Sequence, residues 1–245
     1  YMVKDNSGNN NQIPEFNEPL TVDLTYNNFG NSDAVNAVST ISTNDLYVTL
    51  PVNSYTWPLI ASNGSASATD ALTIQVNDYI PDMHNAYFTI TTQADTSIFS
   101  SGFGITIYAP KLVNGTVTLD DVTSGNGNGQ IDPGETIYFS VPTTNQGHCA
   151  STEVTTQLFV FGDYVTSNSP ATTIGPLAPG ETGNSTFSIS VSPDAPNGST
   201  FSVYITATAG AYNSVSSLSP AVGPQYEDFE TGNFQKYNWR MRGSK

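Results

Sequence analysis

Apolar and polar residues alternate with a period of two along most of this chain, and helical periodicity is nearly absent. Because successive side chains of a strand point to opposite faces, this alternation predicts strands that bury one face in a core. Clusters of Gly, Pro, Asn and Ser separate the alternating runs and are typical of turns. Many short strands joined by turns predict an all-β fold made of antiparallel sandwiches. The clearest runs are Leu20, Val22 and Leu24; Leu72, Ile74 and Val76; Phe103, Ile105 and Ile107; Ile137, Phe139 and Val141; and Phe187, Ile189 and Val191.

An internal repeat divides the sequence into two halves of similar length. Residues 28–30 (Asn-Phe-Gly) match residues 145–147 (Asn-Gln-Gly), and residues 72–76 match residues 187–191 at nearly the same spacing. An immunoglobulin-like sandwich needs about 100 residues, so we predict two in tandem, over residues 1–110 and 111–224. The joint is short and contains Pro110, which favours a semi-rigid rod. Residues 225–245 depart from the pattern and are expected to begin a truncated third domain.

Charge and composition narrow the function classes. The 245 residues include 21 acidic and 6 basic ones, for a net charge of −15. Of the basic residues, only Lys4 and Lys111 precede residue 236. Such a surface repels phosphate backbones, so nucleic acid is excluded as a partner, and it favours divalent cations. No apolar run reaches the ~18–20 residues of a membrane span, and no signal-peptide pattern is present. The chain lacks an initiator Met and ends without a cap, so we expect a fragment of a longer protein.

Residues 124–135, SGNGNGQIDPGE, have the spacing of an EF-hand calcium loop. Gly129 at position 6 suits the left-handed backbone that curls such a loop. Position 1 is a serine where an aspartate is usual, and Asp120 or Asp121 just upstream is a candidate to supply the missing carboxylate. No helix is expected after the loop, because Pro133 and Gly134 follow Asp132. The predicted calcium ligands are Ser124, Asn126, Asn128, Gln130 (through its carbonyl), Asp132 and Glu135, together with Asp121.

Calcium at this loop is expected to bind with modest affinity, roughly 10⁻⁴–10⁻³ M, because few carboxylates are available. It would tie the segment that enters the second sandwich to that sandwich's first strand, and so stiffen the hinge between the sandwiches. An empty turn with left-handed residues is the alternative. A phosphate cradle is less favoured, because no Lys follows the glycines.

The first half contains a related run, residues 7–18 (SGNNNQIPEFNE), which lacks the glycine at position 6. Glu15 and Glu18 are its possible ligands. Without that glycine, we expect a solvated turn here and not a metal site.

Asp120 and Asp121 followed by SGNGNGQIDPGETI, and then Asn-Gln-Gly at residues 145–147, resemble sandwich modules of secreted and surface proteins of Bacteroidetes. The likeness is greatest to the modules behind the catalytic domain of gingipain-like cysteine peptidases. Residues 80–84, 109–112 and 227–234 agree with that family, the last as the start of a jelly-roll domain. The resemblance implies an extracellular or outer-surface accessory region and puts no catalysis in this fragment.

Few residues suggest catalysis. His148 and Cys149 are adjacent, and neighbours on an extended backbone point to opposite faces, so they cannot form a catalytic pair. The same argument applies to Asp120 and Asp121 as paired carboxylates, and His84 is expected to be a loop hydrogen-bonder. Cys149 is the single cysteine, which excludes an internal disulfide. Aromatic residues that could form a sugar-stacking face are Tyr47, Tyr55, Trp57, Tyr108, Phe159, Phe161, Tyr164 and Tyr212.

The sequence therefore predicts a non-catalytic, extracellular spacer or adhesion module with a structural calcium loop. Two alternatives stay open. One is an accessory region that orients a peptidase domain or its substrate, and the other is a module that binds carbohydrate or a host protein. Neighbouring domains of the same chain are the expected partners in each case.

Overall fold

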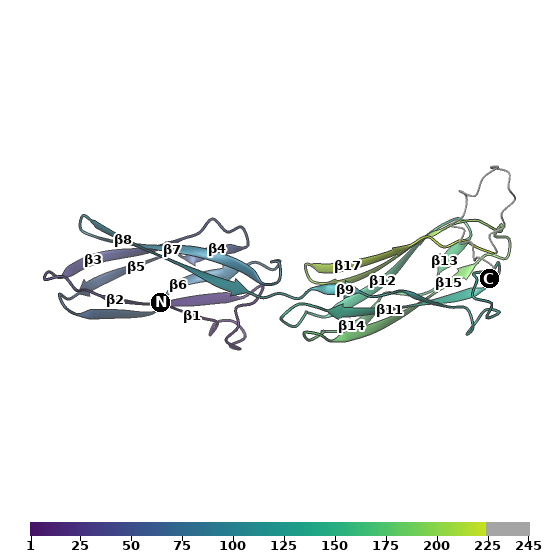
Figure 1. The fold of residues 1–245 in the computed structure, drawn as a ribbon, viewed down its shortest axis with the longest axis horizontal. Coiled ribbons are helices and arrows are strands. Elements are labelled where there is room, and N and C mark those ends of the chain that lie inside the picture. Colours follow the sequence, from purple (N-terminus) through teal and green to yellow (C-terminus); the bar gives the residue numbers. More distant parts are fainter. Residues whose placement is uncertain (224–245) are drawn as a thin grey trace, which may run out of the picture.

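A computed structural model describes residues 1–223 of the chain. These residues form an all-β structure of two sandwiches arranged end to end along the long axis (Figure 1). The predicted fold class is confirmed. None of the described residues belongs to a helix long and apolar enough to cross a bilayer. The predicted third domain, residues 225–245, lies outside the described residues.

The first sandwich consists of two antiparallel sheets, in the orders β1-β2-β6-β4 and β5-β3-β7-β8. Its strands are β1 (Met2–Lys4), β2 (Pro19–Asn27), β3 (Ala34–Ser42), β4 (Val48–Val52), β5 (Ser54–Ile60), β6 (Ser65–Val76), β7 (His84–Ala94) and β8 (Ser97–Ile107).

The second sandwich repeats this order, with sheets β10-β11-β15-β13 and β14-β12-β16-β17, and adds β9 against β11. Its strands are β9 (Leu112–Asn114), β10 (Thr118–Asp120), β11 (Thr136–Asn145), β12 (Val154–Phe161), β13 (Val165–Ser167), β14 (Thr172–Gly175), β15 (Thr182–Val191), β16 (Ser202–Ala209) and β17 (Tyr212–Leu218). The matching strand orders give the sequence repeat a structural basis. The exact boundaries, 1–110 and 111–224, stay predictions.

Each sandwich has its own core between its two sheets. In the first, Trp57, Leu20 and Leu72 are almost completely buried, and in the second Phe139 and Phe187 face each other across paired strands. Burial of one such side chain is worth about 1.5–3 kcal/mol. Along β11 every second residue is buried, which is the alternation that the sequence displays.

The segment between the sandwiches is fixed by the side chain of Asn145, the last residue of β11. Asn145 is fully buried. Its Oδ1 accepts hydrogen bonds from the N–H groups of Lys111 and Gly147, both at 3.0 Å. Its Nδ2 donates to the carbonyls of Cys149 and Leu177, at 2.8 and 2.9 Å. One amide therefore ties the incoming segment to two loops of the second sandwich, the one between β11 and β12 and the one between β14 and β15.

Asn28 plays the same part in the first sandwich. Its Oδ1 accepts from Gly30 N–H at 2.9 Å, and its Nδ2 donates to the carbonyls of Ser32 and Ile60, at 2.9 and 3.0 Å. These bonds correspond to the bonds from Asn145 to Gly147, Cys149 and Leu177. The Asn-X-Gly repeat is therefore a hydrogen-bonding motif at one end of each sandwich.

Two further contacts join the sandwiches. Asp82 accepts hydrogen bonds from Ala109 N–H at 3.1 Å and from His148, whose Nδ1 lies 2.7 Å away. The Tyr212 hydroxyl donates to the Ile80 carbonyl and accepts from the Ile80 N–H, both at 3.1 Å. The Tyr212 side chain packs with the core of the first sandwich, although it belongs to the second. The junction is thus a packed and hydrogen-bonded interface.

Candidate functional site

The predicted calcium loop lies between β10 and β11 (residues 121–135, hereafter loop 2). Asp121 is buried, and its Oδ2 accepts the Gly129 N–H at 2.7 Å. Asp120 points elsewhere, since it accepts hydrogen bonds from Val122 N–H and from the hydroxyl of Thr123. Of the two upstream candidates, Asp121 is the one that the fold brings into the loop.

The other carboxylates of loop 2 are held by its own N–H groups. Glu135 accepts from Asn126 N–H through Oε1 and from Asp132 N–H through Oε2, both at 2.9 Å. Asp132 Oδ2 accepts from the side-chain amides of Asn126 and Asn128, at 2.8 and 2.7 Å. Hydrogen bonds within the loop thus hold three carboxylates and two amide side chains in place, although the carboxylates do not converge on one point.

Two predicted ligands contribute less to this arrangement. Ser124 is exposed at the start of the loop, and Gln130 bonds through its N–H to Asn128 Oδ1 at 2.8 Å. Within residues 1–223, no three His, Cys, Asp or Glu side chains converge as a preformed metal site. Asparagine and backbone oxygens would therefore have to complete a calcium site here. These are all hard oxygen donors, which suit calcium.

The run in the first sandwich (residues 5–18, hereafter loop 1) has the same hydrogen-bond network. Asp5 Oδ2 accepts Gln12 N–H at 2.7 Å, as Asp121 accepts Gly129 N–H. Glu18 accepts the N–H groups of Asn9 and Glu15, at 2.9 and 3.0 Å, and the Asn9 side chain donates to Glu15 at 2.6 Å. Each bond has its counterpart around Glu135.

Residues 6–13 of loop 1 are exposed, as a solvated turn would be, but its anchoring carboxylates are buried, since Asp5 and Glu18 are only 3% and 4% exposed. The missing glycine does not break the loop, because Gln12 adopts the left-handed backbone itself, with φ of 68°. A non-glycine residue in that region costs of order 1 kcal/mol, and the surrounding hydrogen bonds offset it. Asn10 and Asn17 likewise have positive φ where loop 2 has Gly127 and Gly134.

The positions of the two loops correct a second expectation. Loop 2 lies at the end of the second sandwich that faces away from the first, where Ile131 bridges Val222. Loop 1 is the one at the junction, since the Phe16 ring beside it contacts the Tyr212 ring edge-on at 5.3 Å. Calcium in loop 2 would therefore not act on the hinge between the two sandwiches.

Burial affects the charge of loop 1. It raises the pKa of Glu18 above its ordinary value, because desolvation, helped by the nearby charges of Asp5 and Glu15, disfavours the carboxylate more than the two backbone hydrogen bonds favour it. Ionising Glu18 at neutral pH thus costs folding free energy.

The histidines and Cys149 form no catalytic pair. His148 bonds to Asp82, whereas Cys149 is buried, and no hydrogen bond joins the two side chains in the described part of the chain. His84 is the first residue of β7, and its Nε2 lies 2.6 Å from Asp45 Oδ2. Both histidines are thus bound to carboxylates in structural contacts.

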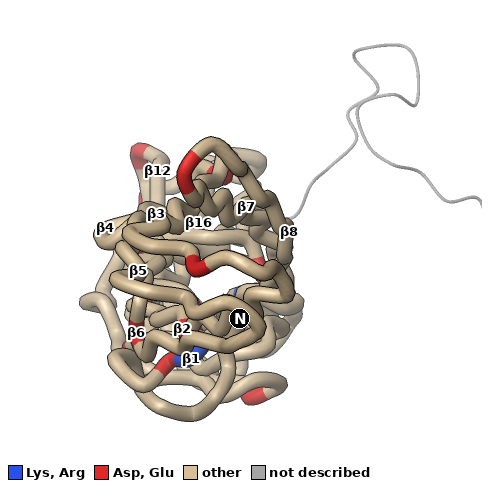
Figure 2. The backbone as a smooth tube through the Cα atoms, turned by 90° about the vertical axis from the view of Figure 1, so that its left-hand side faces the viewer, with Lys and Arg blue, Asp and Glu red and all other residues tan. Residues whose placement is uncertain are grey.

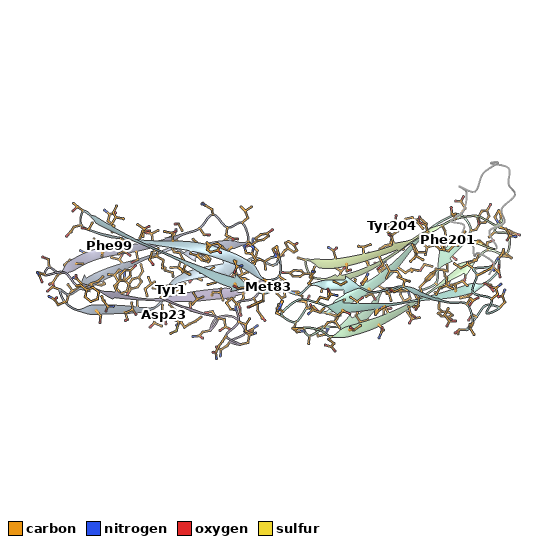
Figure 3. The ribbon with its side chains drawn as sticks, viewed as in Figure 1. Tyr1, Asp23, Met83, Phe99, Phe201 and Tyr204 are labelled. Carbon is orange, nitrogen blue, oxygen red and sulfur yellow. The ribbon has the colours of Figure 1, made fainter. Side chains whose placement is uncertain are left out.

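The aromatic candidates separate into buried and exposed groups. Trp57 and Tyr212 are core residues. Phe159 and Phe161 on β12 are exposed, and Phe161 meets Tyr204 of β16 edge-on at 5.9 Å. Tyr204, labelled in Figure 3, was not among the sequence candidates, but it lies opposite Phe159 in the register of the two strands. These three residues form an exposed aromatic cluster on one sheet.

Comparison with known proteins supports the fold and a general class. Residues 113–219 match the CARDB family, an immunoglobulin-like domain type found in adhesion and surface proteins and not itself catalytic. No curated protein sequence matches the chain. Neither finding bears on the resemblance to accessory modules of gingipain-like peptidases, which stays a prediction.

Solved structures show only a distant likeness. The chain is similar to red sea bream transglutaminase, with 13% identity over 91% of this chain and 31% of that chain, and a TM-score of 0.32. It is also similar to trypsin-activated α2-macroglobulin from Escherichia coli, with 12% identity over 85% of this chain and 17% of that chain, and a TM-score of 0.33. The native form of the E. coli α2-macroglobulin is similar at 12% identity, over 86% of this chain and 16% of that chain, with a TM-score of 0.35. The chain spans less than a third of each of these proteins, and nothing about function follows from them.

Cys149 gives a test of the junction. Burial, with the nearby charges of Glu15, Asp82 and Glu18, raises the pKa of Cys149 to about 12. Because the thiolate is the nucleophile, alkylation by iodoacetamide at pH 8 should be at least about 100-fold slower in the folded chain than in urea. Mass spectrometry over time measures both rates. Equal rates would show that the junction opens freely in solution.

Proposed function

We propose that this region is a non-catalytic spacer of an extracellular or surface protein, which holds the domains at its ends at a fixed separation and orientation. The observation that carries the proposal is the packed junction between the two sandwiches. There the connecting segment bonds to Asn145 and Asp82, and Tyr212 inserts into the first sandwich. A flexible tether would have no such interface. The finer version, in which the rod orients a gingipain-like peptidase domain or its substrate, rests on the sequence resemblance.

The acidic surface fits a solvated spacer. Figure 2, seen along the rod from the free end of the first sandwich, shows scattered acidic positions and few basic ones along the backbone. A net charge of −15 keeps such a chain soluble and discourages self-association.

Substituting Gly147 tests the spacer. A Cβ at Gly147 would lie 2.3 Å from the Ala109 carbonyl oxygen and 2.5 Å from the Lys111 nitrogen, so Gly147→Val must displace the connecting segment. We expect small-angle scattering to show a single extended rod for the natural chain and a broad range of inter-sandwich angles for the variant.

Gly30→Val is the matched control, because Gly30 occupies the equivalent position in the first sandwich, where an added Cβ approaches only Asn28 Oδ1 at 3.1 Å. Its scattering should equal that of the natural chain. If the natural chain already samples a broad range of angles, the spacer proposal fails.

We further propose that loop 2 binds calcium as a structural ion. Asp121, Asp132 and Glu135 would supply the charge, and Asn126 and Asn128 would turn their amide oxygens toward the ion. The hydrogen bonds that these carboxylates now accept leave lone pairs for a cation. The ion would stabilise the far end of the second sandwich, beside Val222.

Calcium titration tests this proposal. With a dissociation constant of roughly 10⁻⁴–10⁻³ M, 10 mM calcium should stabilise the second sandwich by about 1.4–2.7 kcal/mol. The thermal midpoint should then rise by about 5 °C or more. Glu135→Gln should abolish most of that rise, whereas Glu153→Gln, an exposed control, should keep it.

Calorimetry separates the outcomes. One calcium ion bound per chain, with binding lost in Glu135→Gln, supports the site in loop 2. Two calcium ions per chain would indicate that loop 1 binds calcium as well. If calcium leaves both the heat signal and the thermal midpoint unchanged, loop 2 is an empty turn.

A second candidate function is carbohydrate binding, because Phe159, Phe161 and Tyr204 present an exposed aromatic cluster on one sheet. Sugar rings stack on such side chains. A glycan array should then show hits that Phe161→Ala removes and that Phe29→Ala, which changes an exposed aromatic residue on the other sandwich, keeps. An array without hits would dismiss this function and leave the spacer proposal intact.

A further inference from the structure

Loop 2 contains two of the five Asn-Gly pairs in the chain. An Asn-Gly pair is prone to deamidation, because glycine has no Cβ to keep its backbone nitrogen away from the asparagine side chain. In this reaction the nitrogen attacks the side-chain carbonyl carbon, which closes a five-membered succinimide ring and releases ammonia. Water then opens the ring to aspartate or isoaspartate. The five pairs are residues 63–64, 114–115, 126–127, 128–129 and 197–198.

The backbone N–H of the glycine distinguishes these pairs in the folded chain. At four of them it donates a hydrogen bond, so the nitrogen must leave its acceptor before it can attack. Of the five, only the Gly127 N–H has no hydrogen-bond partner within residues 1–223. The four bonds run from Gly64 to the Ala61 carbonyl at 3.0 Å, from Gly115 to the Pro142 carbonyl at 2.7 Å, from Gly198 to the Val222 carbonyl at 2.7 Å and from Gly129 to Asp121 Oδ2 at 2.7 Å.

The side chain of Asn126 is polarised for this attack. Its Oδ1 accepts the Asn128 N–H at 3.0 Å, and its Nδ2 donates to Asp132 Oδ2 at 2.8 Å. An N–H group on the carbonyl oxygen stabilises the negative charge that develops there when the nitrogen attacks the carbon. Asn126 and Gly127 are both exposed, so water reaches them. A Cβ at Gly127 would meet no atom closer than 3.8 Å, so the backbone there has room to move.

Loop 1 has the same side-chain arrangement without the glycine. Asn9 Oδ1 accepts the Asn11 N–H at 3.0 Å, and Asn9 Nδ2 donates to Glu15 Oε2 at 2.6 Å, the same two bonds that Asn126 makes in loop 2. The residue after Asn9 is Asn10, which has the left-handed backbone, with φ of 59°, but carries a Cβ that crowds its nitrogen. Loop 1 is therefore a matched site within the same chain at which the reaction is slow.

We propose that Asn126 is a site of spontaneous deamidation, which gives loop 2 a fourth carboxylate beside those of Asp121, Asp132 and Glu135. The new carboxylate replaces the amide that donates to Asp132, so two negative charges face each other where a hydrogen bond was. A cation relieves this repulsion, and the affinity of calcium sites depends on the number of charged ligands. The affinity of loop 2 for calcium therefore rises as the protein ages. That consequence rests on the calcium site proposed above, whereas the modification itself does not.

Peptide mapping by mass spectrometry tests the modification. The full chain is incubated at pH 8, folded or in concentrated urea, and the conversion of each asparagine is followed over days. In the folded chain Asn126 should convert at least about threefold faster than the other four Asn-Gly pairs, because each of those must first break a hydrogen bond. It should also convert faster than Asn9. In urea the five Asn-Gly pairs should react at similar rates.

Gly127→Asn should lower the rate at Asn126 to that of Asn9, because it gives loop 2 the residue that loop 1 has. Gly198→Asn is the matched control, since Gly198 is also exposed and has a positive φ, of 85°, and it should leave the rate at Asn126 unchanged. The proposal is overturned if Asn126 reacts no faster than the other four pairs in the folded chain, or if its lead persists in urea.

Calorimetry of Asn126→Asp with calcium tests the consequence. This variant should bind calcium at least about fivefold more tightly than the fresh natural chain, because a unit charge about 4 Å from a cation contributes that much even in water. Asn184→Asp adds the same charge where β15 pairs with Pro142, at the far end of β11 from loop 2, and should bind as the natural chain does. Equal affinities of Asn126→Asp and the natural chain would overturn the consequence. If neither binds calcium while Asn126 deamidates selectively, the calcium site fails and the modification stands.

Discussion

The interaction on which the rest of this structure depends is the side-chain amide of the asparagine in each Asn-X-Gly turn, which is fully buried at Asn145 and half-buried at Asn28. Asn145 satisfies two N–H groups and two carbonyls that would otherwise be unpaired. Because an unsatisfied buried polar group costs about 1–3 kcal/mol, no apolar residue of similar size could replace it. The Asn145 amide fixes two loops at one end of the second sandwich and holds the segment that enters it. The geometry of the rod follows from that fixed point.

The repeated loops show that residue type is an incomplete guide to backbone conformation. A glycine at position 6 is the usual sign of a curled oxygen-rich loop, and the first loop lacks it. The structure reaches the same curl with Gln12, since a closed set of hydrogen bonds around Glu18 and Asp5 imposes the left-handed backbone. The shared feature of the two loops is therefore the carboxylate that accepts two backbone N–H groups, Glu18 or Glu135. That carboxylate stands at the same place in both sequences, and its position could have identified the first loop.

The sequence predicted the fold class well because strand alternation directly reflects burial on one face, as in β11 and β15. His148 and Cys149 lie in the bend after β11 and not on a strand, so the alternation argument does not apply to them. The sequence placed the calcium loop at the wrong end of the second sandwich, because alternation gives no information on which end of a sheet a loop reaches. That end follows from pairing, such as the bridge of Ile131 to Val222. Tyr204 was missed as a partner of Phe159 because only the strand register sets them opposite each other.

At the joint between tandem sandwiches, the end of one sandwich must cover its own core and also provide a surface that contacts the next sandwich. In this chain the connecting segment meets both requirements, because it becomes part of the second sandwich. Residues 109–114 supply an edge strand and the buried Leu112 to the second sandwich while Ala109 and Tyr212 remain packed on the first. A large bend at this joint would have to separate β9 from β11 and take Leu112 out of its buried cluster. A strand shared in this way ties the direction of the segment between the sandwiches to the folding of the second one.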